Sequence, residues 1–180
     1  MKIEKETNGA IQHCDITKLW DAVDNGNEWA EMVIIDIYTG FRISELLEIK
    51  KVDVNLEKRI MIGGGTKTAY GLDRRVPIHK CILPLIEKRM QGDSEWLFNK
   101  DGRNISPSEF KGIFLRLLKE LGMDGYIVHA MRHTFITISK MQIDDIVLAH
   151  IVGHGRYKFS DEVLVEEIDK LPGRAELISE

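Results

Sequence analysis

Three short strand-like runs interrupt a chain whose other periodic segments are helical, and they limit its fold more than any other feature. The runs are Val52–Val54, Arg59–Ile62 and Arg74–Ile78. Turn-forming sequences separate them, at Asn55–Lys58 and at the glycine-rich Gly63–Gly71. Short strands joined by such turns are typical of hairpins. The pattern therefore predicts a mainly α protein with a small antiparallel β-sheet, an α+β fold.

Apolar residues at helical spacing predict helices on both sides of this sheet. The strongest start signal is Ser106-Pro107-Ser108-Glu109, with serine at the cap, proline at the first position and glutamate three residues after the cap. Thr39-Gly40 ends a strongly apolar helix, since glycine is the usual terminator. The expected helices cover residues 15–25 (capped by Asp15), 28–38, 42–49, 80–91, 106–121, 129–140, 144–153 and 161–171, with an extended piece at 96–98.

Composition and cysteine content favour one soluble domain. The 180 residues suffice for a real core, and 43% hydrophobic with 30% charged residues is ordinary for a globular protein. No apolar run approaches the roughly 20 residues of a membrane span, and we find no signal peptide. Cys14 and Cys81 lack the spacing of metal ligands and suit a reducing compartment. We therefore expect a cytoplasmic protein without membrane association.

The net charge of −4 argues mildly against nucleic acid, whose binding usually depends on a basic face. The acidic residues are unevenly distributed, however. Residues 161–180 hold seven acidic and two basic side chains, which gives this segment a net charge of −5. The first 160 residues are therefore about neutral, and a basic patch on that part of the surface stays compatible with the composition.

One cationic box combines His129, Arg132 and His133 within five positions. On a helix these three share a face, because residues three and four apart are neighbours. The planar fork of an arginine matches two oxygens of a phosphate-like anion. The box alone also fits a capping or surface cluster. Its significance depends on where the other cationic side chains lie.

Two further cations precede this box. Arg42 follows Thr39-Gly40 at a helix start, where free backbone N–H groups favour an anion. The alternative is a solvated arginine paired with Glu45. Lys67 lies in the glycine-rich turn between two strands, where a nucleotide-binding loop would instead need Gly-Lys-Ser/Thr opening a helix. A simple hairpin tip is the alternative for Lys67.

Histidines four residues apart suggest a metal site as a competing hypothesis. The pairs are His129 with His133 and His150 with His154. A hydrolytic zinc helix has glutamate directly after its first histidine, and neither pair has it. No cysteine, aspartate or glutamate completes a set nearby, although protein zinc sites take three or four ligands. A metal-dependent hydrolase therefore stays a rival, and we expect no metal.

Taken in order, these segments resemble the catalytic domain of the tyrosine recombinases, the phage integrase family. The resemblance covers about residues 13–171. The matching motifs are Thr39-Gly40-Phe41-Arg42-Ile43-Ser44-Glu45-Leu46, Lys67 in the hairpin turn, His129-Ala130-Met131-Arg132-His133-Thr134-Phe135 and Val152-Gly153-His154.

The resemblance implies chemistry at a DNA phosphodiester without metal or other cofactor. Arg42 and Arg132 would clamp the non-bridging oxygens and stabilise the charge of the transition state. His129 and His154 would add hydrogen bonds and handle protons. Lys67 would protonate the departing 5′ hydroxyl. A tyrosine would attack phosphorus and hold the 3′ phosphate covalently until rejoining.

The nucleophile is where the match fails. In the family a tyrosine follows the Gly-His pair by nine or ten residues, and those positions are Val163 and Leu164 here, with Leu164 in the tyrosine's place. Tyr157 is the alternative nucleophile, and Glu45 is expected to support the site by orienting or neutralising a neighbour. The expected function is site-specific DNA recombination through a phosphotyrosine intermediate, impaired by Leu164. The alternative is a catalytically inactive DNA-binding remnant.

The resemblance also sets expectations for domains and partners. Residues 1–12 would be an irregular leader and residues 13–180 the catalytic domain, without the N-terminal domain with which the family closes a clamp around DNA. Double-stranded DNA is the expected partner. The acidic segment from Glu166 onward would either support self-association on DNA or pack on its own subunit.

Overall fold

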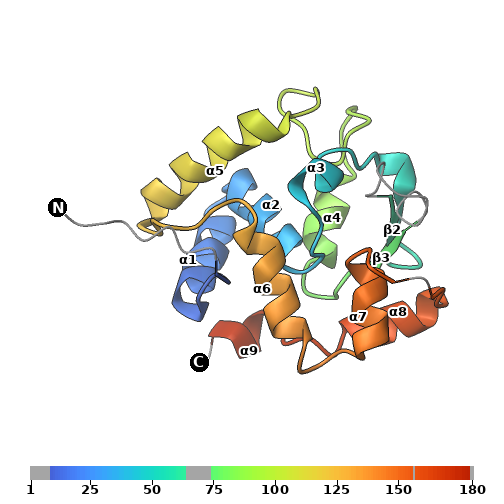
Figure 1. Ribbon diagram of the computed structural model, residues 1–180. Coiled ribbons are helices and arrows are strands. Elements are labelled where there is room, and N and C mark those ends of the chain that lie inside the picture. The colour runs from blue at the N-terminus through green and yellow to red at the C-terminus, as the bar shows by residue number, and fades with distance from the viewer. Residues whose placement is uncertain (1–8, 64–73, 156, 179–180) are drawn as a thin grey trace.

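The computed structural model describes residues 9–63, 74–155 and 157–178, which form a mainly helical protein with one three-stranded antiparallel sheet (Figure 1). The predicted fold class is confirmed. Within these ranges, no helix has both the length and the apolar character needed to cross a membrane. The elements are α1 (His13–Asp24), α2 (Glu28–Ile37), α3 (Ile43–Leu46), β1 (Val54–Asn55), β2 (Ile60–Ile62), β3 (Arg75–Pro77), α4 (Leu83–Arg89), α5 (Pro107–Leu121), α6 (Ala130–Ser139), α7 (Asp145–Ile151), α8 (Asp161–Ile168) and α9 (Arg174–Ile178).

Helix α2 is the centre of the core. Eight of its ten residues are buried, because it packs against α1, α4, α5 and α6 (Figure 1). The Asn27 side chain caps its start by accepting hydrogen bonds from two backbone N–H groups. At its other end the chain turns sharply at Gly40, whose φ of 68° is costly for any residue with a Cβ. This turn directs the following residues toward α6.

The sheet has the strand order β1-β2-β3, and it is paired so that Met61 lies opposite both Val54 and Val76. Its last strand contacts α7 and α8. The first strand begins two residues later than predicted. Lys51–Asp53 form a 3₁₀ turn instead, closed by a hydrogen bond from the Asp53 N–H to the Lys50 carbonyl.

Local signals located some helix ends correctly and others wrongly. The Ser106 side chain caps α5 as predicted, accepting from the Glu109 N–H. The cap predicted at Asp15 is wrong, because α1 already begins at His13 and the Asp15 carboxylate instead accepts hydrogen bonds from Tyr126 and Lys18. Helix α9 was not predicted. It packs against α1, which is distant in sequence but adjacent in Figure 1.

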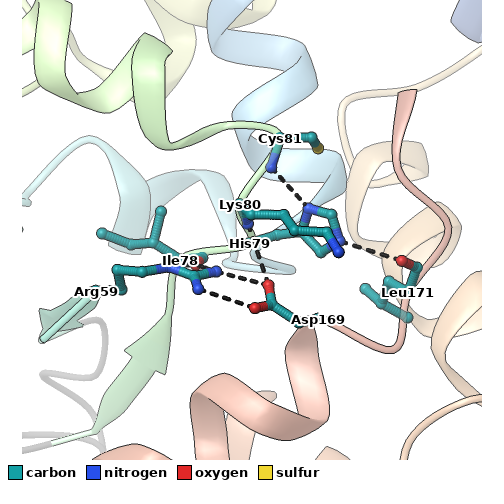
Figure 2. A network of polar contacts seen from close by, with 7 residues as sticks. All are labelled: Arg59, Ile78, His79, Lys80, Cys81, Asp169 and Leu171. Atoms are coloured by element: carbon teal, nitrogen blue, oxygen red, sulfur yellow. Dashed lines mark hydrogen bonds and ion pairs between the residues drawn. The ribbon is translucent and has the colours of Figure 1, made fainter. Parts of the chain in front are cut away.

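A polar network attaches the end of α8 to the sheet (Figure 2). The Arg59 guanidinium donates two hydrogen bonds to the Asp169 carboxylate, at 2.8 and 2.6 Å, and two more to the Ile78 carbonyl. The buried His79 ring bonds the Leu171 carbonyl through Nε2 and accepts the Cys81 N–H at Nδ1. Its burial lowers the pKa of His79, so the ring is neutral at pH 7. The C-terminal segment therefore packs on its own subunit here.

The turn at Gly40 yields the first prediction. A Cβ there would lie 2.2 Å from Phe135 Cδ1, on a backbone that already has positive φ. We expect Gly40→Ala to lower the free energy of unfolding by about 2–4 kcal/mol, from overpacking and backbone strain together. Urea denaturation measures this change.

Gly112, exposed within α5, is the matched control, because a Cβ added at this position would meet no other atom within 4 Å. Gly112→Ala should be neutral or more stable by roughly 0.5–1 kcal/mol, since alanine favours helix. If both substitutions changed the free energy of unfolding equally, the close approach of Phe135 to Gly40 would not limit which residue can occupy that position.

Candidate functional site

Three of the predicted site residues line one pocket. Arg42 precedes α3, and His129 and Arg132 belong to the start of α6. The pocket has a volume of about 220 Å³, and its lining is Phe41, Arg42, Ile43, Ser44, Val128, His129 and Arg132. The turn after α2 and the start of α6 therefore bring together cations that lie some ninety residues apart in sequence.

Arg132 holds this arrangement in place. Its side chain is buried, with Nη1 donating to the Gly40 carbonyl at 2.7 Å and Nη2 donating to the Val152 carbonyl at 2.8 Å. It thereby joins the turn after α2 to the turn after α7, where His154 lies exposed. Burial, with help from the cations Arg42 and Arg74, lowers the pKa of Arg132 to about 10, so it stays charged at pH 7.

Arg42 pairs with Glu45 and also lines the pocket, so both alternatives that the sequence raised for this arginine apply. The Arg42 side chain is 46% exposed, and its Nη1 donates to Glu45 Oε1 at 3.1 Å. The Arg42 backbone N–H donates to the other oxygen of the same carboxylate, at 3.0 Å. Arg42 is therefore both a partly solvated, paired arginine and a wall of the pocket. The Glu45 carboxylate offsets the charge of Arg42 through this contact.

Arg74 is a charged residue of the site that sequence reasoning missed. It is buried, its Nη2 donates to Glu45 Oε2 at 3.0 Å, and its guanidinium lies 5.0 Å from the centre of the Phe41 ring. Strand alternation could have identified it. Residues two apart in a strand face the same side, so Arg74 points with the buried Val76 into the protein, while Arg75 points away and pairs with Asp161.

Asp36 is a second missed residue, completely buried in the last turn of α2. The Thr39 hydroxyl lies 3.5 Å from its Oδ1. Burial raises the pKa of Asp36 to about 8, although the positive charge of Arg132 acts in the opposite direction. In the sequence, Asp36 is one polar position within the apolar run of α2, and nothing local distinguishes it. Only its burial near the arginines marks it as part of the charge balance.

The histidines of the site are exposed and favour the neutral form. Burial of part of the ring lowers the pKa of His129, as do the neighbouring His133, Arg132 and Arg42. The pKa of His154 is lowered by partial burial and by the same two arginines together with Arg74. The site thus holds cations close enough to disfavour additional protons, which is the electrostatic setting of an anion site.

The metal hypothesis finds no third ligand in the part of the chain that the structure describes. The His129 and His133 rings pack edge to face, with centroids 4.7 Å apart. His150 directs Nδ1 toward the Tyr157 carbonyl and packs against Phe159. Across residues 9–63, 74–155 and 157–178, no group of three or more possible ligand side chains gathers.

The two candidate nucleophile positions have opposite surroundings. Leu164 is fully buried in α8. Tyr157 is 65% exposed, and it lines a second pocket of about 400 Å³ together with His154. Lys67, the predicted proton donor, lies outside the described residues. Tyr157 thus lies on the surface like His129 and His154, while Leu164 belongs to the core.

Comparison with known proteins agrees with this geometry. The sequence profile of the phage integrase family matches residues 10–159. The tyrosine recombinase XerA of Pyrococcus horikoshii is 30% identical over 162 residues, which is 85% of this chain and 55% of XerA. The chain therefore spans little more than half the length of this curated relative.

Solved structures share the fold. The integrase from mycobacterium phage Brujita superposes with a TM-score of 0.70 at 20% identity, over 99% of this chain and 64% of that one. The Tn1549 transposon integrase, solved in complex with circular intermediate DNA, gives a TM-score of 0.68 at 20% identity, over 91% of this chain and 65% of that one.

The electrostatics of the histidines can be tested by substitution. Arg42 lowers the pKa of both His129 and His154, so Arg42→Gln should raise both values toward the ordinary histidine value of 6.5. Arg103→Gln is the matched control, because Arg103 pairs with Glu109 and affects neither ring. Histidine ring resonances followed by NMR over pH 4–9 give the values. If the pKa values of His129 and His154 did not change in Arg42→Gln, the Arg42 guanidinium would not act on these two rings.

Proposed function

The chain belongs to the phage integrase family of tyrosine recombinases, and we propose that it binds duplex DNA and acts in site-specific recombination by DNA strand cleavage and rejoining. Residues 13–180 would serve as the catalytic domain. The proposed place of action is the cytoplasm, and no metal or other cofactor is part of the proposal. Duplex DNA is the partner, and self-association on DNA through the C-terminal segment is a further part of the same proposal.

One observation carries this proposal, namely the shared pocket of Arg42, His129 and Arg132. Two guanidiniums and an imidazole can donate to the oxygens of one phosphodiester. Donors fixed before the reaction stabilise the charge of a phosphorane-like transition state without reorganising. Arg132 is fixed by two backbone carbonyls, while Arg42 is half exposed and free to approach a ligand. The pocket thus combines one rigid and one adaptable cation.

The proposed reaction conserves the energy of the phosphodiester. The tyrosine hydroxyl gives its proton to a neutral imidazole, His129 or His154, as its oxygen forms a bond to phosphorus. The bond from phosphorus to the 5′ oxygen breaks, and Lys67 supplies the proton to that leaving oxygen. His129 and His154, neutral at pH 7, can each donate or accept a hydrogen bond. Attack by the freed 5′ hydroxyl of another strand reverses the step and releases the tyrosine.

A DNA-binding remnant is the second candidate function, favoured by Leu164. A leucine side chain has no nucleophilic atom, and this one is buried in the core. Tyr38 and Tyr126 use their hydroxyls in hydrogen bonds to Pro172 and Asp15. Tyr157 is exposed and close to His154 in the pocket that both line. Among the tyrosines that the structure describes, cleavage would therefore fall to Tyr157, and without it the site binds phosphate and does not cut.

Binding to duplex DNA tests the function common to both candidates. We expect Arg42→Ala and Arg132→Ala each to weaken binding, more at low salt than at high, because one phosphate contact fewer reduces the salt slope by about one. Arg132→Lys, which keeps the charge but loses the fork, checks that effects do not come from unfolding. Filter binding at two ionic strengths is the measurement, with Arg103→Ala as control. Equal affinities for all variants would contradict the phosphate-binding role.

A covalent-adduct assay distinguishes the two candidates. The chain, Tyr157→Phe and Leu164→Tyr are each incubated with nicked duplex DNA carrying the ends of its parent element, denatured and examined for DNA-linked protein. If the first candidate holds, the unmodified chain forms an adduct. If the second holds, only Leu164→Tyr forms one, and the melting temperature of this variant is checked because the position is buried. An adduct that the unmodified chain forms and Tyr157→Phe loses would instead identify Tyr157 as the nucleophile.

A further inference from the structure

The Glu45 carboxylate is shared by two arginines of very different exposure. Oε1 accepts from the exposed Nη1 of Arg42 at 3.1 Å. Oε2 accepts from Arg74 Nη2 and from the Arg42 backbone N–H, both at 3.0 Å. The side chains of Arg42 and Arg74 are 46% and 2% exposed. Oε2 thus has a fixed partner in the buried Arg74, whereas Oε1 has an exposed partner in Arg42 that can leave.

Glu45 needs a cation of its own. Its side chain is only 11% exposed, and a carboxylate in such surroundings is strongly destabilised when its last cationic partner departs. If Arg42 were that last partner, any anion would have to compete with Glu45 for it. Arg74 removes this conflict, because it stays on Oε2 when the Arg42 guanidinium moves away.

Arg74 cannot itself move easily. Its guanidinium packs on the Phe41 ring, and its Nη1 approaches Gly153 so closely that a Cβ on that glycine would lie only 2.4 Å away. Gly153 adjoins His154, so the same side chain touches the turn that carries a second site residue. Arg74 lies directly before β3, and its side chain approaches both Phe41, which precedes α3, and Gly153 in the turn after α7.

We propose that Arg74 is a positioning residue, which holds Glu45 in place so that the Arg42 guanidinium can exchange its carboxylate contact for a phosphate oxygen. This inference depends on the proposed phosphate-binding role of the pocket. Arg74 does not touch the phosphate. It acts through Glu45. Its removal leaves Arg42, among the described residues, as the one guanidinium hydrogen-bonded to this nearly buried carboxylate, which keeps Arg42 neutralised.

The test is a titration with inorganic phosphate, monitored through the Arg42 Nε–H resonance by NMR. We expect Arg74→Gln to weaken phosphate binding roughly fivefold or more, within the range of coupled neighbouring residues. Arg74→Lys, which can still reach Glu45 with one donor, should recover part of the affinity. Arg75→Gln removes the same charge from the next position, where the side chain pairs with Asp161, and should change the affinity little. Melting temperatures confirm that each variant folds.

A double-mutant cycle separates positioning from other roles. In Glu45→Gln no carboxylate competes for Arg42, so adding Arg74→Gln should have almost no further effect on phosphate affinity. An equal loss in both backgrounds would mean that Arg74 attracts phosphate directly or merely supports the fold, and would overturn the inference. So would an Arg74→Gln affinity equal to that of Arg75→Gln, or a native protein whose Arg42 resonance does not respond to phosphate.

The same variants titrated with a 20-base-pair duplex separate this inference from the proposed function. Phosphate binding that follows the expected cycle, without any duplex binding by the native protein, would refute the DNA function and leave the role of Arg74 intact. Duplex binding by the native protein, with additive effects of Arg74→Gln and Glu45→Gln, would support the DNA function and refute the role of Arg74.

Discussion

The two hydrogen bonds from Arg132 to the Gly40 and Val152 carbonyls are the constraint on which the site depends. Hydrogen bonds to a charged group contribute about 1.5–3 kcal/mol each, and a buried guanidinium left without acceptors would be very costly. The two turns must therefore stay where they can satisfy Arg132. Since one turn leads to Arg42 and the other to His154, a single buried side chain sets the spacing of these two residues and of Arg132 itself.

Charge balance explains why such a cluster is stable without a ligand. Arg42, Arg74 and Arg132 repel one another, and Glu45 offsets part of this repulsion by accepting from two of them. Asp36, buried in α2, adds negative charge near Arg132 when it is ionised, and burial keeps it largely protonated near neutral pH. The site therefore carries a net positive charge, which a bound phosphate can neutralise. A chain of net charge −4 can hold such a site because its acidic residues gather elsewhere.

Ion pairs attach the C-terminal helix α8 to the sheet, next to which Arg74 lies. Arg75 of β3 pairs with Asp161 at the start of α8. Arg59, directly before β2, pairs with Asp169 after the end of α8 (Figure 2), so both ends of that helix are held at the sheet. Leu164 lies between these two attachments in the sequence and is fully buried in the core. Helix α9 continues onto α1, where Arg174 pairs with Asp24. The C-terminal segment is thereby part of the fold of its own subunit.

Sequence alone determined the fold class and most helices, because periodicity and capping are local properties. The resemblance of its motifs to a family suggested Arg42, His129, Arg132 and His154 as site residues, and the structure places the first three at one pocket. Sequence reasoning misjudged the starts of α1 and β1. The Asp15 carboxylate accepts from the distant Tyr126 and does not cap α1, and Lys51–Asp53 form a local 3₁₀ turn before β1. Strand alternation could have pointed Arg74 inward, but the partners of Arg74 and of Asp36 emerged only from tertiary structure. Their importance comes from burial beside charges that are distant in the chain, and burial is decided by how elements pack. No local signal records which carboxylate two remote arginines will share.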